Sequence, residues 1–282
     1  MVELTANGQT VNFFDHDHSM HDNLMIAFSG GTDSSLLLYL ACTYMPEKKI
    51  VCQTGTDLAK DPFVGEYAKD IMIWMKKQFP NVNIIHELYT FNSMSLENIE
   101  IARKQIEEYE KLGTRWKYPS VYGHAKRVAQ DPFKHKIRLK HNITMSTHGI
   151  TMNPPVDVQK KIGFTHLAEP RRNHKYDVLE PKGEKYLHVK PFVNIDKRWV
   201  AGMYEKLGLM DELFPLTASC IGDNDDSRYY TEPCGDCFWC HEKLWAFGCY
   251  DGGLKPKDLS PKKPKKITNV ANMDPDAQHA IK

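Results

Sequence analysis

Short apolar runs alternate with longer segments of helical periodicity over the first part of the chain. The run at residues 24–28 ends at a Ser-Gly-Gly turn, and the run at residues 49–54 ends at Gly55. Apolar runs of this length, closed by turn residues, are typical of buried strands. Residues 34–41 between them are almost wholly apolar and predict a buried helix.

Two more strand and helix pairs follow. Residues 63–79 have the spacing of an amphipathic helix that stops at Pro80, and residues 82–88 alternate as a strand does. Residues 96–112 form a charged amphipathic pattern that predicts another helix. Because parallel strands need a crossover connection, this order predicts an α/β fold, a parallel sheet flanked by helices.

The later part of the chain continues the pattern more weakly. Residues 143–146 predict a fourth strand and residues 189–193 a fifth. Asp196 is placed to cap a helix that runs to Leu207, and Gly208 fits the position after the helix end.

A long stretch, residues 153–188, lacks clear periodicity and is rich in Pro, Lys, Arg and His. We expect an insertion or a lid there, with Arg171 and Arg172 near the mouth of the nucleotide site. The sequence thus predicts an α/β domain over residues 1–207, a cysteine-rich segment over 208–254 and a Lys/Pro-rich tail over 255–282.

Composition narrows the class of protein. The chain has 282 residues, of which 41% are hydrophobic and 26% charged, as in ordinary globular proteins. Its formal net charge of +1 gives no sign of a basic coat for nucleic acid, so we expect nucleic acid not to be a partner. No apolar run approaches the roughly 20 residues of a membrane helix, and the first residues do not resemble a secretory signal. We therefore expect a cytoplasmic protein that does not contact a membrane.

The loop after the first strand carries candidate phosphate ligands. It comprises Ser29, Gly30, Gly31, Thr32, Asp33, Ser34 and Ser35. Two glycines let backbone N–H groups approach an oxyanion, and the following helix directs its positive end to the same place. Asp33 repels phosphate, so it suits a Mg²⁺ ion or the ordering of the loop. An ordinary strand-to-helix turn is the alternative that these residues alone leave open.

This loop, SGGTDSS, resembles the SGGxDS pyrophosphate loop of the N-type ATP pyrophosphatase (PP-loop) family. The resemblance implies the HUP-like, Rossmann-like α/β fold and cleavage of ATP between its α and β phosphates. It also implies ATP and Mg²⁺ as ligands of the loop, with Ser29 and Asp33 as its catalytic residues.

Five of the seven cysteines crowd into one late stretch: Cys220, Cys234, Cys237, Cys240 and Cys249. An odd number of cysteines, two CxxC steps in series and no signal peptide favour a metal site over disulfides. Four thiolates suit tetrahedral Zn²⁺, although the spacing is also a partial iron–sulfur pattern. We prefer Cys220 to Cys249 as the fourth ligand, because Cys249 lies beyond the helix expected at residues 241–248.

The sequence CGDCFWCHEKLWAF and the segment before it resemble the end of 7-cyano-7-deazaguanine (preQ0) synthases, with Lys243 where Arg is usual. The resemblance implies a structural zinc site at Cys220, Cys234, Cys237 and Cys240. It also implies a homodimer that converts 7-carboxy-7-deazaguanine, ammonia and ATP to preQ0. The longer interval between Cys220 and Cys234 and the 153–188 insertion depart from the family pattern.

Other functions remain as alternatives. A sulfate-nucleotide reductase or a tRNA thiolase has the same fold, and a thiolase would use Cys237 or Cys240 catalytically. A zinc-stabilised protein that binds nucleotides or nucleic acid without catalysis is the alternative outside the enzymes.

Overall fold

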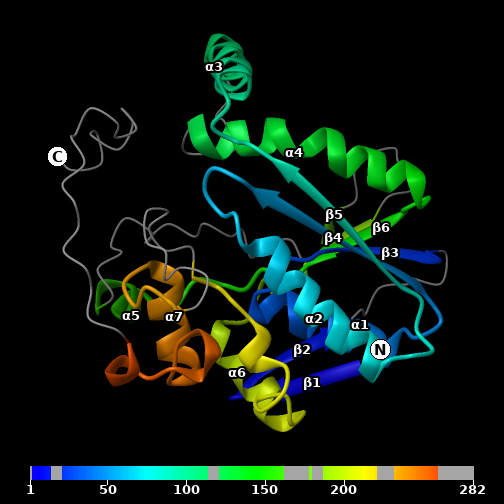
Figure 1. Cartoon of the computed structure of the whole chain (residues 1–282), viewed down its shortest axis with the longest axis vertical. Helices are drawn as coiled ribbons and strands as arrows, with labels where there is room; N and C mark the ends of the chain where they lie inside the picture. The colour runs from blue at the N-terminus through cyan, green and yellow to red at the C-terminus, as the bar shows by residue number, and fades with distance from the viewer. Residues whose placement is uncertain are drawn as a thin grey trace.

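The structure, a computed structural model, describes residues 2–13, 21–113, 121–161, 178–179, 187–220 and 232–259. The strands are β1 (Val2–Ala6), β2 (Gln9–Phe13), β3 (Asn23–Ala27), β4 (Lys49–Asp57), β5 (Ile84–Phe91), β6 (Met145–His148), β7 (Val178–Leu179) and β8 (Leu187–Val189). The α-helices are α1 (Thr32–Tyr44), α2 (Val64–Gln78), α3 (Leu96–Lys111), α4 (Val121–Lys140), α5 (Val156–Lys161), α6 (Lys197–Lys206) and α7 (Phe238–Phe247) (Figure 1).

The central sheet has the strand order β5-β4-β3-β6-β8-β7. All pairs are parallel except β7 with β8, which is antiparallel. The chain builds outward from β3 through β4 to β5 and then crosses to β6 on the other side of β3. The predicted α/β fold, a parallel sheet flanked by helices, is confirmed. Ligands of such sheets bind at the carboxyl ends of the strands where the order reverses, here β3 and β6.

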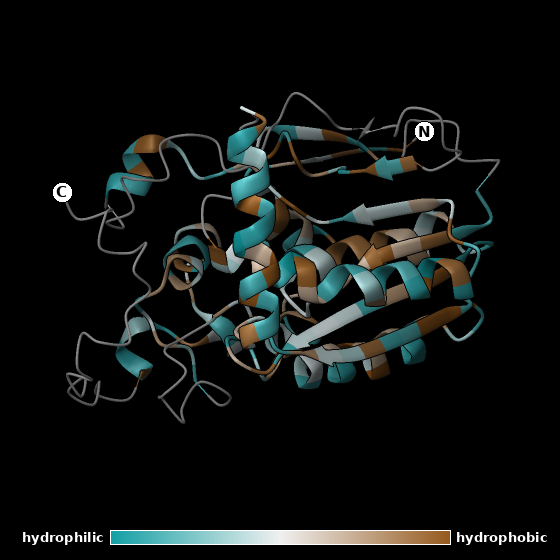
Figure 2. Ribbon diagram, turned by 90° about the horizontal axis from the view of Figure 1, so that it is seen from above, coloured by the Kyte–Doolittle hydropathy of each residue, from teal (hydrophilic) through white to brown (hydrophobic). Residues whose placement is uncertain are grey.

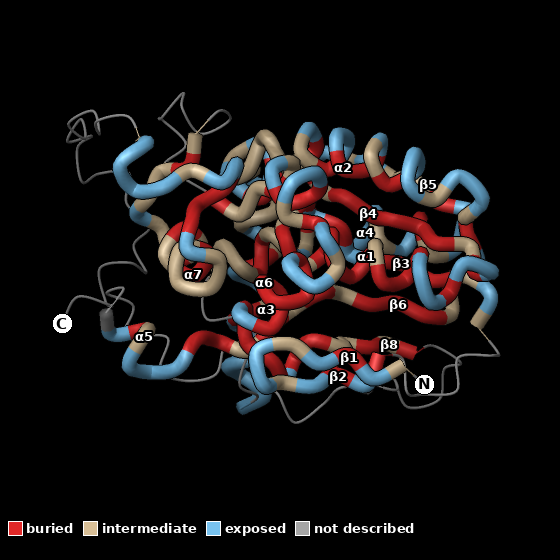
Figure 3. The backbone as a smooth tube through the Cα atoms, turned by 90° about the horizontal axis from the view of Figure 1, so that it is seen from below, coloured by how far each residue is buried: buried red, intermediate tan, exposed pale blue. Residues whose placement is uncertain are grey.

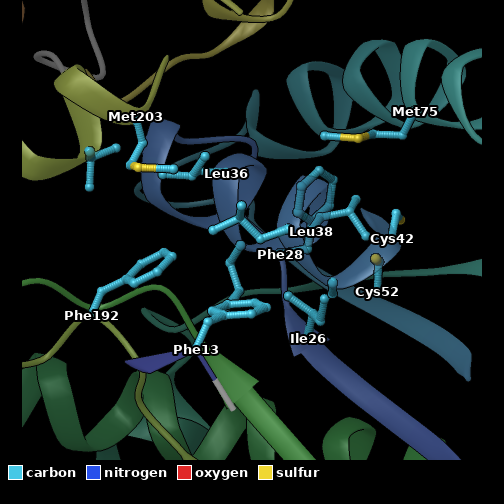
Figure 4. Packing of buried hydrophobic residues seen from close by; sticks show 14 of the residues in the cluster. Phe13, Ile26, Phe28, Leu36, Leu38, Cys42, Cys52, Met75, Phe192 and Met203 are labelled. Atoms are coloured by element: carbon cyan, nitrogen blue, oxygen red, sulfur yellow. The ribbon is translucent and has the colours of Figure 1, made fainter. Parts of the chain in front are cut away.

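Helices cover both faces of this sheet. The main core lies on the face of α1, α2 and α6, where residues such as Ile26, Leu38 and Met75 pack together (Figure 4). On the opposite face, Ile137 of α4 packs against Met25 and Val51 of the sheet. Helix α3 packs on α4 rather than on the sheet (Figure 1). The strands β3, β4 and β6 are accordingly buried along most of their length (Figure 3).

A β1–β2 hairpin, which the sequence reading missed, extends the main core. Its turn residues Asn7 and Gly8 both have positive φ, at 47° and 72°, as a two-residue hairpin turn requires. The hairpin packs on α6, where a Cβ added at Gly202 would lie 2.8 Å from the side-chain Nδ2 of Asn7. The Asn-Gly pair was the available signal for this hairpin.

Several predicted boundaries were wrong. Strand β4 continues through Gly55 to Asp57. Gly55 has no side chain, so the ring of Tyr89 on β5 can pack directly on it. The fifth strand spans Leu187–Val189 rather than residues 189–193. The long helix α4 was not foreseen, because charged residues and Pro132 obscure its single buried stripe. Figure 2 shows the outer helices as mixtures of hydrophilic and hydrophobic positions.

Other local predictions are confirmed. The side chain of Asp196 accepts a hydrogen bond from the Arg198 amide and caps α6. Gly208 follows that helix with φ of 68°. Within residues 153–188 the structure describes α5, the short β7 and the beginning of β8, and Arg171 and Arg172 lie outside the described residues. No helix among the described ranges is long and apolar enough to cross a membrane.

Candidate functional site

The glycine loop occupies the switch point of the sheet, between the end of β3 and the start of α1. Gly30 has φ of 74°, and a Cβ there would lie 3.1 Å from the backbone nitrogen of Ala68 on α2. Gly149, just after β6, packs against the same loop. A Cβ added at this position would lie 2.6 Å from the carbonyl oxygen of Asp33. Both glycines are therefore required by close packing, and they bring the ends of β3 and β6 together.

Ala27 lies beside this loop as the last residue of the central strand β3. It is exposed, although the three residues before it are buried. His148 of β6 is its direct neighbour in the parallel register, so the two side chains point to the same face of the sheet. The exposed Ala27 and the imidazole of His148 therefore lie side by side at the switch point.

The hydroxyl residues of the loop take different places. Ser29 is exposed, and its backbone amide and hydroxyl both lie 3.3 Å from the hydroxyl oxygen of Ser34. Thr32 and Ser35 are fully buried in the first turn of α1. The first N–H groups of α1 lack helical partners and lie at this loop. Ser29 and these N–H groups are thus available to an anion, and Ser34 braces the turn.

Asp33 forms an ion pair that the sequence reading missed. The Lys197 ammonium at the start of α6 lies 2.6 Å from Asp33 Oδ2, and the lysine side chain is 6% exposed. Glu242 of α7 lies on its other side, with Oε2 at 3.7 Å, and is 1% exposed. One buried ammonium therefore stands between two carboxylates at the edge of the glycine loop.

The second oxygen of Asp33, Oδ1, is buried and has no hydrogen-bond partner among the residues that the structure describes. A buried carboxylate oxygen without a donor is unfavourable in the free protein, and it is a ligand type that Mg²⁺ prefers. The residues present therefore fit a Mg²⁺ ion held through Asp33.

The structure brings together the four cysteines predicted as metal ligands. Their sulfur atoms all lie within 4.8 Å of one another. The Cys234–Cys240 sulfur distance is 3.9 Å and the Cys220–Cys237 distance is 4.0 Å. Zn–S bonds of about 2.3 Å in a tetrahedron place sulfurs about 3.8 Å apart. In a four-iron cluster an iron separates each thiolate from the cluster centre, so its sulfurs stand farther apart. This spacing therefore fits one metal ion.

Backbone amides also point at these sulfurs. The amides of Asp236 and Cys237 donate to Cys234 Sγ at 3.4 and 3.3 Å. Amide donors of this kind stabilise a thiolate, which is the form of cysteine that binds metal. Gly235 makes the turn with φ of 69°. Cys249 lies outside the group, and burial raises its pKa, as expected of a core thiol.

Lys243, at the position of the usual arginine, has a buried structural role. It is 1% exposed and donates to Thr217 Oγ1 at 3.1 Å and to the Asp251 carboxylate. Asp251 in turn accepts the backbone amides of Ser219 and Cys220, both at 2.8 Å. This network fixes the segment that delivers the first cysteine ligand.

Comparison with known proteins finds similarity of structure only. No protein-family model matches the chain, and no curated protein matches it. Solved structures with a similar fold include the U34-tRNA thiolase NcsA of Methanococcus maripaludis with its 4Fe–4S cluster, at 15% identity and TM-score 0.41. That likeness covers 75% of this chain and 63% of the thiolase, so this chain spans less than two thirds of the thiolase's length.

The structures of two synthetases are also similar to that of this chain. NMN synthetase from Francisella tularensis has 11% identity and TM-score 0.41, and covers 89% of this chain and 93% of its own. NH3-dependent NAD synthetase from Campylobacter jejuni has 11% identity and TM-score 0.37, with 68% and 67% covered. At these identities the likeness concerns the backbone alone.

Proposed function

We propose that this chain is an ATP-dependent C–N ligase of the PP-loop family that converts 7-carboxy-7-deazaguanine and ammonia to preQ0. The observation that carries the proposal is the glycine loop at the switch point, with Lys197 and the unpartnered Asp33 Oδ1 beside it. This arrangement offers N–H groups and an ammonium to phosphate oxygens and a carboxylate to a cation. The sequence resemblances supply the choice of acid.

The chemistry follows from the poor reactivity of a carboxylate, whose leaving group would be oxide. A carboxylate oxygen attacks the α-phosphorus of ATP, and pyrophosphate leaves. Ammonia then attacks the carbonyl carbon, and a proton and AMP leave to give the amide. The amide oxygen attacks the α-phosphorus of a second ATP, pyrophosphate leaves again, and the loss of AMP and of both N–H protons of the amide forms the nitrile.

The chain's residues stabilise the charge that develops in these steps. Ser29, Gly30, Gly31 and the first turn of α1 bind the departing pyrophosphate, and Lys197 supplies a positive charge at the same place. Asp33 would hold Mg²⁺, which neutralises phosphate charge when bound. Ser34 orders the loop, since its hydroxyl donates to the Gly31 carbonyl and accepts from the Ser29 amide. Thr32 and Ser35 contribute their backbone to the first turn of α1.

Zinc is the metal that we propose for the four cysteines, with a structural role. A site of four thiolates leaves no open position for a substrate. The short sulfur distances support a single ion rather than the cluster of an iron–sulfur thiolase. Metal analysis by plasma mass spectrometry, with assays for iron and acid-labile sulfide, tests this proposal.

The function is tested by incubating the protein with ATP, Mg²⁺, ammonium and the acid, and following AMP, pyrophosphate and the organic products by mass spectrometry. The proposal expects the amide as intermediate and the nitrile as product, with two AMP formed per nitrile. ATP cleavage that does not depend on the acid or on ammonia would contradict it.

The resemblance also leads us to propose a homodimer, which light scattering tests.

A further inference from the structure

The chain after β6 forms one wall of the candidate site. Gly149 packs on Asp33, as described above, and the Met152 amide donates to the Ile195 carbonyl at 2.8 Å. Ile195 lies two residues before Lys197. Asn153 comes directly after these contacts, in the segment that follows the carboxyl end of β6, and ligands of such folds collect at the carboxyl ends of the strands.

Asn153 is buried without a hydrogen-bond partner. The residue is 9% exposed, and neither its Oδ1 nor its Nδ2 is hydrogen-bonded in the part of the chain that the structure describes. The side-chain amide of Gln159 is half satisfied: its Nε2 donates to the Pro154 carbonyl at 2.8 Å, whereas its Oε1 has no partner among the described residues. An orphaned buried amide destabilises a folded protein, so a ligand that satisfies it explains its presence.

The amide group fits a particular ligand chemistry. It presents one acceptor and, beside it in the same plane, a donor group. A heterocycle that carries a ring N–H next to a carbonyl oxygen is complementary to it through two hydrogen bonds. The acid substrate of the proposed function has this edge, at its ring N1–H and C6 carbonyl.

We propose that Asn153 is a specificity-determining residue that reads the ring N–H and adjacent carbonyl oxygen of the heterocyclic acid. This inference rests on the proposed function, because it assigns Asn153 to the acid and not to ATP. The phosphates of ATP belong to the loop before α1, whereas Asn153 follows β6 on the other side of the switch point. Two ligands that must react together are thereby held from two neighbouring strands.

The test uses Asn153→Leu, in which an apolar side chain of similar shape replaces the amide, with Asn153→Ala as a second variant. Binding of 7-carboxy-7-deazaguanine and of Mg²⁺-ATP is measured by calorimetry. We expect the leucine variant to bind the acid about thirtyfold more weakly, or about 2 kcal/mol at about 1.4 kcal/mol per factor of ten. ATP affinity should stay within about twofold, and the melting temperature should not fall because the orphaned amide is gone.

The control variant is Asn81→Leu, at an exposed position before β5, which should bind both ligands as the wild type does. A second arm needs no variant of the protein. The N1-methylated acid lacks the ring N–H, so it should bind the wild type as weakly as the natural acid binds Asn153→Leu. This arm gives a result even if both variants fold poorly.

Unchanged affinity for the acid in a folded Asn153→Leu variant, or wild-type binding of the methylated acid, would overturn the inference. Loss of ATP affinity in the variant would overturn it too, because Asn153 would then read the adenine. If the wild type neither binds the acid nor forms AMP with it, the proposed function itself fails. The first three outcomes leave AMP formation by the wild type intact, so the two failures are distinguishable.

Discussion

The backbone amide of Ala218 donates to the carbonyl of Gly30 at 3.0 Å, which ties the cysteine-rich segment to the glycine loop. Cys220 lies two residues beyond Ala218, and Asp251 holds the amides of Ser219 and Cys220. The candidate metal site is thus connected through one short backbone segment to the loop that we expect to bind pyrophosphate. We therefore expect that the loss of the metal from the cysteines also weakens the binding of the nucleotide.

Cys237→Ser should lower the metal content well below one ion per chain. Structural metal contributes directly to folding, so the melting temperature should fall, and ATP affinity should fall with it through the Ala218 contact. Plasma mass spectrometry, calorimetry and thermal unfolding measure the three effects. Cys249→Ser is the control and should keep its metal. A metal-free Cys237→Ser variant with wild-type stability and ATP affinity would contradict the coupling.

Asp33→Ala should abolish AMP formation while leaving the sheet folded. The substitution removes the carboxylate oxygen that fits Mg²⁺ and frees Lys197, but it removes no side chain from the core clusters. Circular dichroism and AMP release by mass spectrometry measure the outcome. Asp211→Ala, at an exposed position, serves as the control. Unchanged ATP turnover in Asp33→Ala would sink the assignment of the loop.

Lys197→Met should weaken ATP binding by about 2 kcal/mol, since hydrogen bonds to charged groups contribute about 1.5–3 kcal/mol. The substitution also leaves Asp33 and Glu242 without their shared cation, so the protein should lose stability. Adding Glu242→Gln should restore part of the stability without restoring ATP affinity. Calorimetry and chemical denaturation separate the two effects.

Lys206→Met, at the exposed end of α6, is the control for the loss of a lysine from the same helix. It should change neither property. Recovery of ATP affinity in the double variant would show that Lys197 acts only on folding.

Stability should decline in acid because of His86 on β5. Burial, with Lys76 and Lys69 adding to it, lowers the pKa of His86 to about 4, and its Nε2 lies 2.9 Å from Thr54 Oγ1. The unfolded chain takes up the proton near pH 6.5 and the folded chain only near pH 4, so stability falls as the pH drops between these values. After allowance for partial exposure we expect a loss of about 2 kcal/mol.

The measurement is urea denaturation at a series of pH values from 7 to about 4, near the shifted pKa of His86. His86→Gln keeps a polar partner for Thr54 and should flatten the profile in this range. An equally steep profile in the variant would place the acid sensitivity at another group.

Much of the site could be read from the sequence because its parts are local. The glycine loop needs only a strand, two glycines and a helix start in succession, and the two CxxC steps need only a tight turn at Gly235. Short motifs of this kind carry their geometry within a few residues. The βα pattern likewise fixed a parallel sheet, since parallel neighbours require crossovers.

Tertiary packing decided the rest. Lys197 and Asp33 are 164 positions apart, and no local pattern pairs them. They meet because Gly202 lets α6 pack closely on the hairpin while Gly149 brings β6 against α1. The burial of Asn153 and of Glu242 has the same origin. Which polar groups lose water on folding depends on how distant elements pack together, and that is a property of the whole core rather than of any segment.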